Sequence, residues 1–326
     1  MKRISILVPK RAILGSLEGT RMIFTQVNQI FQSQGAPALF DVQLVGLTRE
    51  TPVSGGAFTA NATALITEVD ETDLIVIPAL DGEITSAIDD NKEFIPWIVK
   101  QYKNGAEIAS LCMGAFLLAE TGLLKGKKCS THWMAANEFR KLFPDIELVD
   151  DKVVTEEQGI YSSGGAFSYL NLILHLIEKY AGRDMAIFVS KIFAIEIERR
   201  TQTPFTIFQG QKDHEDEEVK QAQEFIEKHF NDKLTVDQLA KMFYIGRRTF
   251  ERRFKKATTN TVIEYIQRVK IEAAKKMLES SRENVNEVMY NVGYSDSKAF
   301  RNIFKKVVGY SPLEYKRKYN KEGAYA

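Results

Sequence analysis

The chain has 326 residues, enough for two domains with separate hydrophobic cores. Its hydrophobic content of 44% is ordinary for a globular protein, and no apolar run approaches the roughly 20 residues that a membrane-spanning helix needs. The two cysteines, Cys112 and Cys129, argue against a disulfide framework and fit a reducing cytoplasm. We therefore expect a cytoplasmic protein that contacts no membrane and carries neither a metal nor a cofactor.

Charge is distributed unevenly along the chain. Residues 217–320 contain 22 lysines and arginines against 14 aspartates and glutamates, a net charge of +8. Because the whole chain carries +1, the remainder carries −7. A basic C-terminal part joined to an acidic body is typical of a DNA-binding protein with a separate sensing or assembly domain.

The first 200 residues alternate between strand-like and helix-like segments. The N-terminal segment 1–9 lacks a small-residue cleavage site, so it is interpreted as a first strand rather than a signal peptide. The predicted strands are 4–8, 40–47, 74–78, 107–111 and 159–163, and the predicted helices are 20–34, 94–103, 114–121, 167–180 and 185–199. This alternation predicts a doubly wound α/β sheet with helices on both faces, a flavodoxin-like sandwich.

Cys112 lies between the predicted strand 107–111 and the helix that follows it. Ser110 two residues before it and Gly114 two residues after it are small, which is the pattern of a nucleophile elbow. A cysteine at a helix N-terminus tends to have a lowered pKa, so we expect a lowered thiol pKa here. The alternative is that Cys112 is a buried small hydrophobic residue.

Two further residues could reach the crevice at Cys112. His132 follows twenty residues later, and Glu18 follows the first strand. Ligands of open α/β sheets bind at the carboxyl ends of the strands, so we expect the three residues to converge there as a ligand pocket or a vestigial active site. The alternative for His132 is a core position, and Cys129 is interpreted as structural.

A repeat occupies the last third of the chain. Val236, Phe243, Phe250 and Phe254 have counterparts in Val285, Val292, Phe300 and Phe304, at an offset of 49 residues that becomes 50 after the turn. Each copy has the pattern of a helix-turn-helix unit with a basic second helix, so the sequence predicts two DNA-reading units. Residues 201–218, with Pro204, Gly210 and a run of charges, are interpreted as the linker between domains 1–200 and 219–326.

The buried phenylalanine pairs define the outward face of each second helix. The outward residues, which we predict to contact double-stranded DNA, are Arg247, Arg248, Glu251, Arg252 and Lys255 in the first copy and Ser297, Lys298, Arg301, Asn302, Lys305 and Lys306 in the second. Arginine, asparagine and glutamate can read guanine, adenine and cytosine edges. Lysines at the helix ends, including Lys256, suit phosphates.

The C-terminal part resembles the AraC/XylS family of bacterial transcription regulators over about residues 221–319. The resemblance rests on RRTFERRFKK, on a long helix over 262–278, and on VGYSDSKAFRNIFKKVVGYSPLEYKR. It implies two rigidly joined helix-turn-helix units that read adjacent major-groove segments. Tyr244 stands where the first turn of the family usually has glycine, and we expect it to adopt a left-handed conformation at modest cost.

The N-terminal part resembles the ThiJ/PfpI branch of the class-I glutamine amidotransferase-like fold over about residues 3–198. The string SLCMGAFLLAETGLLKGKKCSTHW is similar to the regulator subfamily typified by GlxA. Enzymes of this fold use the elbow cysteine, a histidine, a glutamate and a glycine-rich turn that supplies oxyanion donors. Here that turn, 78–82, lacks paired glycines and Met113 is bulky, which counts against catalysis. The resemblance implies a homodimer and a sensor of a small nitrogenous metabolite.

We therefore expect a ligand-responsive DNA-binding regulator rather than an enzyme, with double-stranded DNA, a small-molecule effector and a second copy of the chain as partners and RNA polymerase as a further candidate. A ligand can act only through different affinities for two arrangements of the protein. The alternatives are a cysteine hydrolase or amidase fused to a DNA-binding domain, and a redox sensor that uses Cys112.

Overall fold

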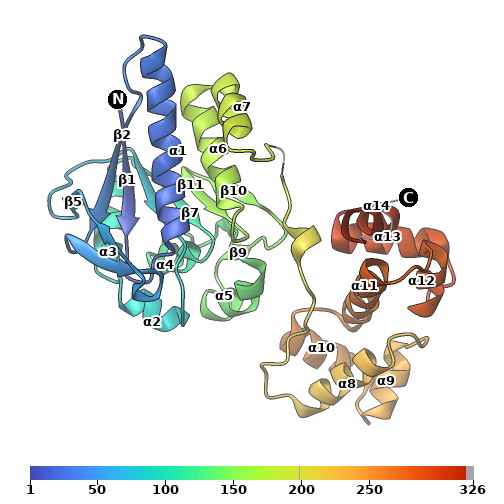
Figure 1. Ribbon diagram of the computed structural model, residues 1–326. Coiled ribbons are helices and arrows are strands. Elements are labelled where there is room, and N and C mark those ends of the chain that lie inside the picture. Colours follow the sequence, from blue (N-terminus) through green and yellow to red (C-terminus); the bar gives the residue numbers. More distant parts are fainter. Residues whose placement is uncertain (198, 321–326) are drawn as a thin grey trace. The chain divides into compact units, whose positions relative to one another are not determined.

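The computed structural model divides into two compact units, Met1–Gln202 and Thr203–Ala326 (Figure 1). It describes residues 1–197 and 199–320. Residue 198 of the predicted helix 185–199 and the last six residues of the predicted domain 219–326 lie outside the described residues. No helix in the described part of the chain is long and apolar enough to cross a membrane.

A seven-stranded sheet forms the centre of the first unit, in the order β10-β11-β7-β6-β1-β2-β5. Its strands are β1 (Lys2–Val8), β2 (Phe40–Gly46), β5 (Ala64–Leu65), β6 (Leu74–Ile77), β7 (Glu107–Leu111), β10 (Val154–Glu157) and β11 (Ile160–Ser163). All neighbours pair in parallel except β10 and β11. Two small pairs, β3 (Glu50–Val53) with β4 (Phe58–Asn61) and β8 (Lys128–Cys129) with β9 (Glu147–Leu148), complete the strands.

Helices cover both faces of this sheet, which confirms the predicted doubly wound fold. One core includes α1 (Leu14–Ser33), α6 (Tyr169–Ala181) and α7 (Arg183–Ile192), and the other includes α2 (Ile84–Asp89), α3 (Phe94–Lys103), α4 (Gly114–Glu120) and α5 (Ala136–Leu142). In β6, Leu74 and Val76 enter the first core while Ile75 and Ile77 enter the second. A strand buried on both faces therefore reads as a continuous apolar run.

Two helix boundaries differ from the prediction. Helix α1 begins at Leu14, six residues earlier than predicted. The prediction started late because Gly15 and Gly19 interrupt the apolar pattern that marks a helix. A Cβ at Gly19 would lie 2.4 Å from the Tyr169 hydroxyl, so packing requires the glycine. Helix α7 ends at Ile192 rather than near 199, because Ala194 is left-handed with φ of 52°. Short 3-10 turns are present at Ser54–Gly56, Trp133–Ala135 and Thr203–Phe205.

The second unit is helical. Its helices are α8 (Glu217–Lys228), α9 (Val236–Met242), α10 (Arg247–Thr258), α11 (Val262–Ser280), α12 (Val285–Asn291), α13 (Ser297–Val308) and α14 (Pro312–Tyr319). They build two hydrophobic cores, one around Phe250 and Phe254 and the other around Phe300 and Phe304. Helix α11 supplies Tyr265 to the first core and Leu278 to the second, so one helix connects the two.

Candidate nucleic-acid interface and candidate effector pocket

The first helix-turn-helix unit is formed by α9 and α10. Helix α9 begins with a capping box, in which Thr235 and Gln238 satisfy each other's backbone amides. The turn that follows is left-handed at Tyr244, with φ of 54°, and this side chain is 98% exposed. The predicted conformation of Tyr244 is therefore confirmed, and the open surroundings explain why a large side chain is tolerated.

The second unit, α12 and α13, repeats this design. A capping box of Asn284 and Glu287 starts α12, and Gly293 takes the left-handed position with φ of 75°. Here the turn packs tightly, since a Cβ on Gly293 would lie 2.1 Å from the carbonyl oxygen of Asn231 and 2.6 Å from Nζ of Lys270. Only glycine satisfies both the backbone angle and the available space.

The predicted reading face of α10 is exposed to solvent. Phe250 and Phe254 are fully buried, and the outward residues Arg247, Arg248, Arg252 and Lys255 are exposed while Glu251 is half-buried. Arg247 donates to Asp237 at 2.9 Å and lies 3.5 Å from Glu251, so these residues already have partners within the protein. DNA must compete with these pairs to engage Arg247 or Glu251.

The predicted reading face of α13 has a different chemistry. Phe300 and Phe304 are buried, and the outward residues are Ser297, Lys298, Arg301, Asn302, Lys305 and Lys306, all exposed except the half-buried Ser297. Asp296 caps this helix by accepting from the backbone N–H groups of Lys298 and Ala299. At the start of α10, Gly246 supplies no side-chain cap. The contacts of either face with DNA stay a prediction.

Two residues that the sequence analysis did not single out form polar contacts between helices of the C-terminal part, Thr203–Ala326. Arg253 lies on α10 but forms ion pairs with Asp216 and Glu218 instead of facing outward with Arg252. Lys270 on α11 is only 6% exposed, and its Nζ donates to the carbonyl oxygens of Val292 at 2.9 Å and of Asp232 at 3.2 Å. Burial lowers the pKa of Lys270. The sequence signal for Arg253 was its counterpart in the repeat, Ile303, which marks an inward position.

The elbow at Cys112 forms as predicted. Cys112 follows β7 with φ of 52°, a left-handed conformation that is strained for a side chain other than glycine. Gly114 allows the turn to close, because a Cβ there would lie 2.5 Å from the Pro78 carbonyl oxygen. The Cys112 carbonyl accepts from Oγ1 of Thr131 at 2.9 Å, which places the segment before His132 beside the elbow.

The expected lowering of the thiol pKa is wrong. Burial raises the pKa of the Cys112 thiol to about 11, although the backbone N–H of Met113 opposes this shift, and Cys112 is only 4% exposed. The cost of removing a thiolate from water therefore exceeds the benefit of its place at a helix start. Burial likewise raises the pKa of Cys129 to about 12, as expected of an inert structural cysteine.

His132 and Glu18 do not form hydrogen bonds to Cys112 in the described part of the chain. The His132 ring accepts from the backbone N–H of Met134 at 3.2 Å, and burial lowers the pKa of this imidazole. Both carboxylate oxygens of Glu18 accept from Arg21, at 2.7 and 2.6 Å. The convergence of Cys112, His132 and Glu18 as a ligand pocket or a vestigial active site stays a prediction.

In the turn 78–82, where the resemblance implies oxyanion donors, three backbone amides already have partners within the protein. Ala79 N–H donates to Ser16 Oγ at 3.0 Å, Asp81 N–H donates to the Arg11 carbonyl at 2.9 Å, and Gly82 N–H donates to Asp81 Oδ1 at 2.8 Å. Donors with existing partners cannot stabilise a developing oxyanion without breaking those bonds.

A small hollow lies beside the elbow. Its lining is mostly apolar and consists of Leu80, Asp81, Gly82, Ile84, Ala87, Ile88, Met113 and Phe116. Met113 directly follows Cys112, and the turn at Leu80 follows β6, so the hollow lies at the carboxyl ends of two central strands. This is where open α/β sheets bind small molecules.

Both parts of the chain match known families. Residues 23–179 match the DJ-1/PfpI family, and residues 239–318 match a helix-turn-helix domain. A putative transcriptional regulator from Vibrio parahaemolyticus covers 59% of this chain and 98% of its own, with a TM-score of 0.53 and 23% identity. A ThiJ/PfpI family protein from Pseudomonas syringae covers 60% of this chain and 75% of its own, with a TM-score of 0.50 and 17% identity. These two likenesses show the fold of the first unit.

Curated relatives span both units. The transcriptional regulators GbdR and CdhR of Pseudomonas aeruginosa are 23% and 25% identical over 68% of this chain. The matched part spans 61% of GbdR and 66% of CdhR, less than two thirds of either relative. The bifunctional transcriptional activator and DNA repair enzyme AdaA of Bacillus subtilis is 33% identical over 31% of this chain and 48% of its own. This chain therefore joins a domain of the DJ-1/PfpI family to a C-terminal helix-turn-helix domain of the AraC type.

Proposed function

We propose that this protein is a transcription regulator that reads a specific DNA sequence with both helix-turn-helix units. The observation that carries the proposal is the pair of exposed, cationic reading faces on α10 and α13, each built on its own core and joined through α11. Cationic side chains supply affinity for phosphates, while arginine and asparagine side chains distinguish bases.

The test is selection of duplexes from a random pool by the full chain at 150 mM salt. We expect an enriched motif with two blocks, one for each major-groove segment, since each reading helix contacts its own segment. Enrichment of no motif, or binding that disappears for every sequence at the same salt concentration, would contradict sequence-specific reading.

The first unit is proposed to sense a small nitrogenous metabolite in the hollow beside Cys112. Asp81 supports this choice, because it is the one acidic residue among those that line the hollow and a carboxylate can pair with an ammonium group. A thermal-shift screen of the full chain against amino acids, betaines, carnitine-like amines and polyamines tests the idea. We expect an upward shift that Asp81→Asn and Cys112→Ala reduce, whereas a shift unchanged in both variants would place the ligand elsewhere.

The elbow is proposed to bind a ligand rather than to catalyse a reaction. Support comes from the protonated thiol and from the engaged amides of the turn 78–82. The rate of Cys112 alkylation by iodoacetamide should keep rising with pH through pH 10, because the thiolate forms only near pH 11. A plateau below pH 8 would revive the hydrolase and redox alternatives.

A homodimer is part of the proposal. Phe188 and Ile192 lie one turn apart on α7 with 49% and 46% of their surfaces exposed, and they support a contact between copies of the chain. Two copies on one DNA raise the overall affinity. Sedimentation of the full chain should show a dimer at micromolar concentration and a shift toward monomer in Phe188→Asp, while a wild-type monomer would exclude this assembly.

A further inference from the structure

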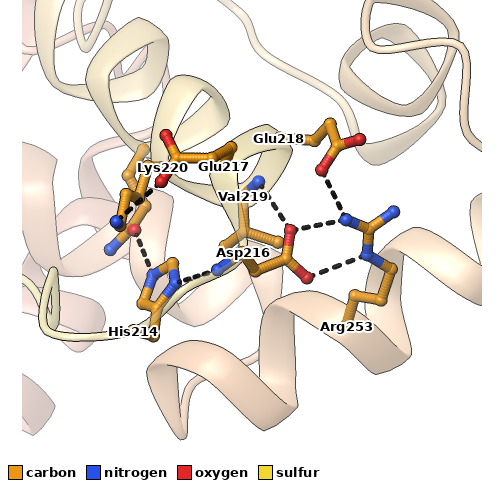
Figure 2. A network of polar contacts seen from close by, with 8 residues as sticks. His214, Asp216, Glu217, Glu218, Val219, Lys220 and Arg253 are labelled. Carbon is orange, nitrogen blue, oxygen red and sulfur yellow. Dashed lines mark hydrogen bonds and ion pairs between the residues drawn. The ribbon is translucent and has the colours of Figure 1, made fainter.

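Arg253 occupies an unusual position on the first reading helix. It is half-buried, at the border between the buried side of α10, with Phe250 and Phe254, and the exposed side, with Arg252. Figure 2 shows its guanidinium directed at the start of α8. Nε donates to Oδ2 of Asp216 at 2.8 Å and Nη2 donates to Oδ1 at 2.6 Å, a bidentate pair. Nη2 also donates to Glu218 at 2.6 Å. Planar bidentate pairing fixes both partners in one orientation.

The Asp216 end of this pair is tied into the segment that precedes α8. The Asp216 carboxylate also caps α8 by accepting from Val219 N–H at 3.2 Å, and its own N–H donates to Nδ1 of His214 at 3.2 Å. The other ring nitrogen of His214 lies 2.9 Å from Oε1 of Gln223, whose amide donates to the Gln211 carbonyl at 2.8 Å. The segment 211–218 is therefore fastened at several points, and one of them is α10 (Figure 2).

The second helix-turn-helix unit, α12 and α13, lacks this attachment. The counterpart of Arg253 is Ile303, a half-buried residue that packs against the second core. An apolar residue is thus sufficient at this helical position for the fold. The arginine occurs in the first copy of the repeat. This copy follows the segment that leads from residues 1–202 into the DNA-binding helices.

We propose that Arg253 is a positioning residue that fastens the segment 211–218 to reading helix α10, so that the position of this segment sets the DNA affinity of the first helix-turn-helix unit. This inference rests on the proposed function. Movement of the chain upstream of residue 211 is then passed to a DNA-reading helix by the ion pairs of Arg253. The Arg253 guanidinium is the largest cause that lowers the pKa of Asp216, which agrees with a carboxylate held in its charged form.

The test compares two charge removals on the full chain, measured with a duplex that the wild type selects from a random pool. Asp216→Asn keeps a good helix cap but weakens the grip on Arg253. Glu217→Gln is the matched control, because Glu217 is the next residue and pairs with Lys220 at 2.8 Å instead of Arg253. Loss of a negative charge alone makes binding to DNA equal or tighter.

We expect Asp216→Asn to weaken binding about fivefold and Glu217→Gln to leave it equal or tighter. Arg253→Ile should weaken binding about tenfold with an unchanged salt slope, since a lost phosphate contact would instead reduce that slope by about one. The double variant of Arg253 and Asp216 should be no weaker than Arg253→Ile alone. Equal behaviour of Asp216→Asn and Glu217→Gln would overturn the proposal.

Amide hydrogen exchange separates this inference from the proposed function, because it requires no DNA. Arg253→Ile should accelerate exchange across residues 211–218 and α10 while leaving α12 and α13 as protected as in the wild type. Unchanged exchange in both segments would overturn the attachment even if DNA binding were established. If the wild type selects no duplex, the proposed function fails, and exchange alone decides whether Arg253 couples the segment to α10.

Discussion

The two helix-turn-helix units share the capping box of the first helix, the buried phenylalanine pair and a left-handed residue in the turn, yet they differ in what surrounds that turn. Tyr244 in the first unit is almost fully exposed, whereas Gly293 in the second is pressed against Asn231 and Lys270. The first unit is instead attached through Arg253 to the segment before α8. Equivalent backbone shapes are thus held in place by different neighbours.

This difference indicates that close packing fixes the turn of the second helix-turn-helix unit, while ion pairs of Arg253 hold the first unit to the segment before it. Lys270 bonds to carbonyl oxygens at the end of α12 and after α8, which bridges the two units. We therefore expect substitutions at the second turn to affect stability most, and substitutions on the first reading helix to affect specificity most.

The largest expected effect is on the second turn. Gly293→Ala should destabilise α12 and α13 by about 3 kcal/mol. The alanine would be strained at a positive φ, and its Cβ would clash with the carbonyl oxygen of Asn231. Tyr244→Gly should change stability by less than about 1 kcal/mol. Native-state hydrogen exchange of the α12 and α13 amides measures the first effect; equal costs at the two turns would remove the contrast between the units.

The next effect concerns base reading. Arg252→Ala should weaken binding to the selected duplex by roughly 1–3 kcal/mol and relax one base preference, because arginine donates two bonds to guanine. Its counterpart in the second unit is Asn302, so Asn302→Ala should relax a preference in the other block of the motif. Titrations against single-base variants of the duplex check both; a uniform loss across all variants would show that these side chains do not read bases.

A smaller effect is expected on the spacing of the two blocks. Lys270→Met removes a polar link between the two helix-turn-helix units, so discrimination against a duplex with one inserted base pair should fall about fivefold, roughly 1 kcal/mol. Lys275→Met is a matched buried lysine on the same helix that bonds instead to the Thr206 carbonyl and to Glu272. Equal loss of discrimination in both variants would point to general destabilisation of α11.

The smallest expected effect is at the end of α13. Lys306→Ala should weaken binding roughly threefold for every sequence and flatten the salt dependence by about one unit of slope, since a phosphate contact carries no base information. Affinity measured at several salt concentrations on selected and scrambled duplexes checks this. If only the selected duplex is affected, Lys306 belongs to the base-reading set.

Periodicity and repeats predicted the layers of the sheet, the elbow at Cys112 and both helix-turn-helix units, because these depend on local pattern. The start of α1 escaped prediction because Gly15 and Gly19 break that pattern, and at Gly19 the reason is packing against Tyr169 of α6. The thiol pKa escaped it because burial of Cys112 depends on the whole fold. The role of Arg253 escaped it because the partner Asp216 lies 37 residues earlier in the sequence and only the fold brings the two side chains together.

Helix α11 belongs to two hydrophobic cores at once, and this limits how the DNA-binding helices can be separated. A chain truncated after α11 would keep the core around Phe254 but expose Ile271, Ala274 and Leu278, which are buried in the second core. Such a product would present an aggregation-prone apolar stripe rather than a functional half. The two copies therefore depend on one shared helix for their folding, although they have separate reading faces.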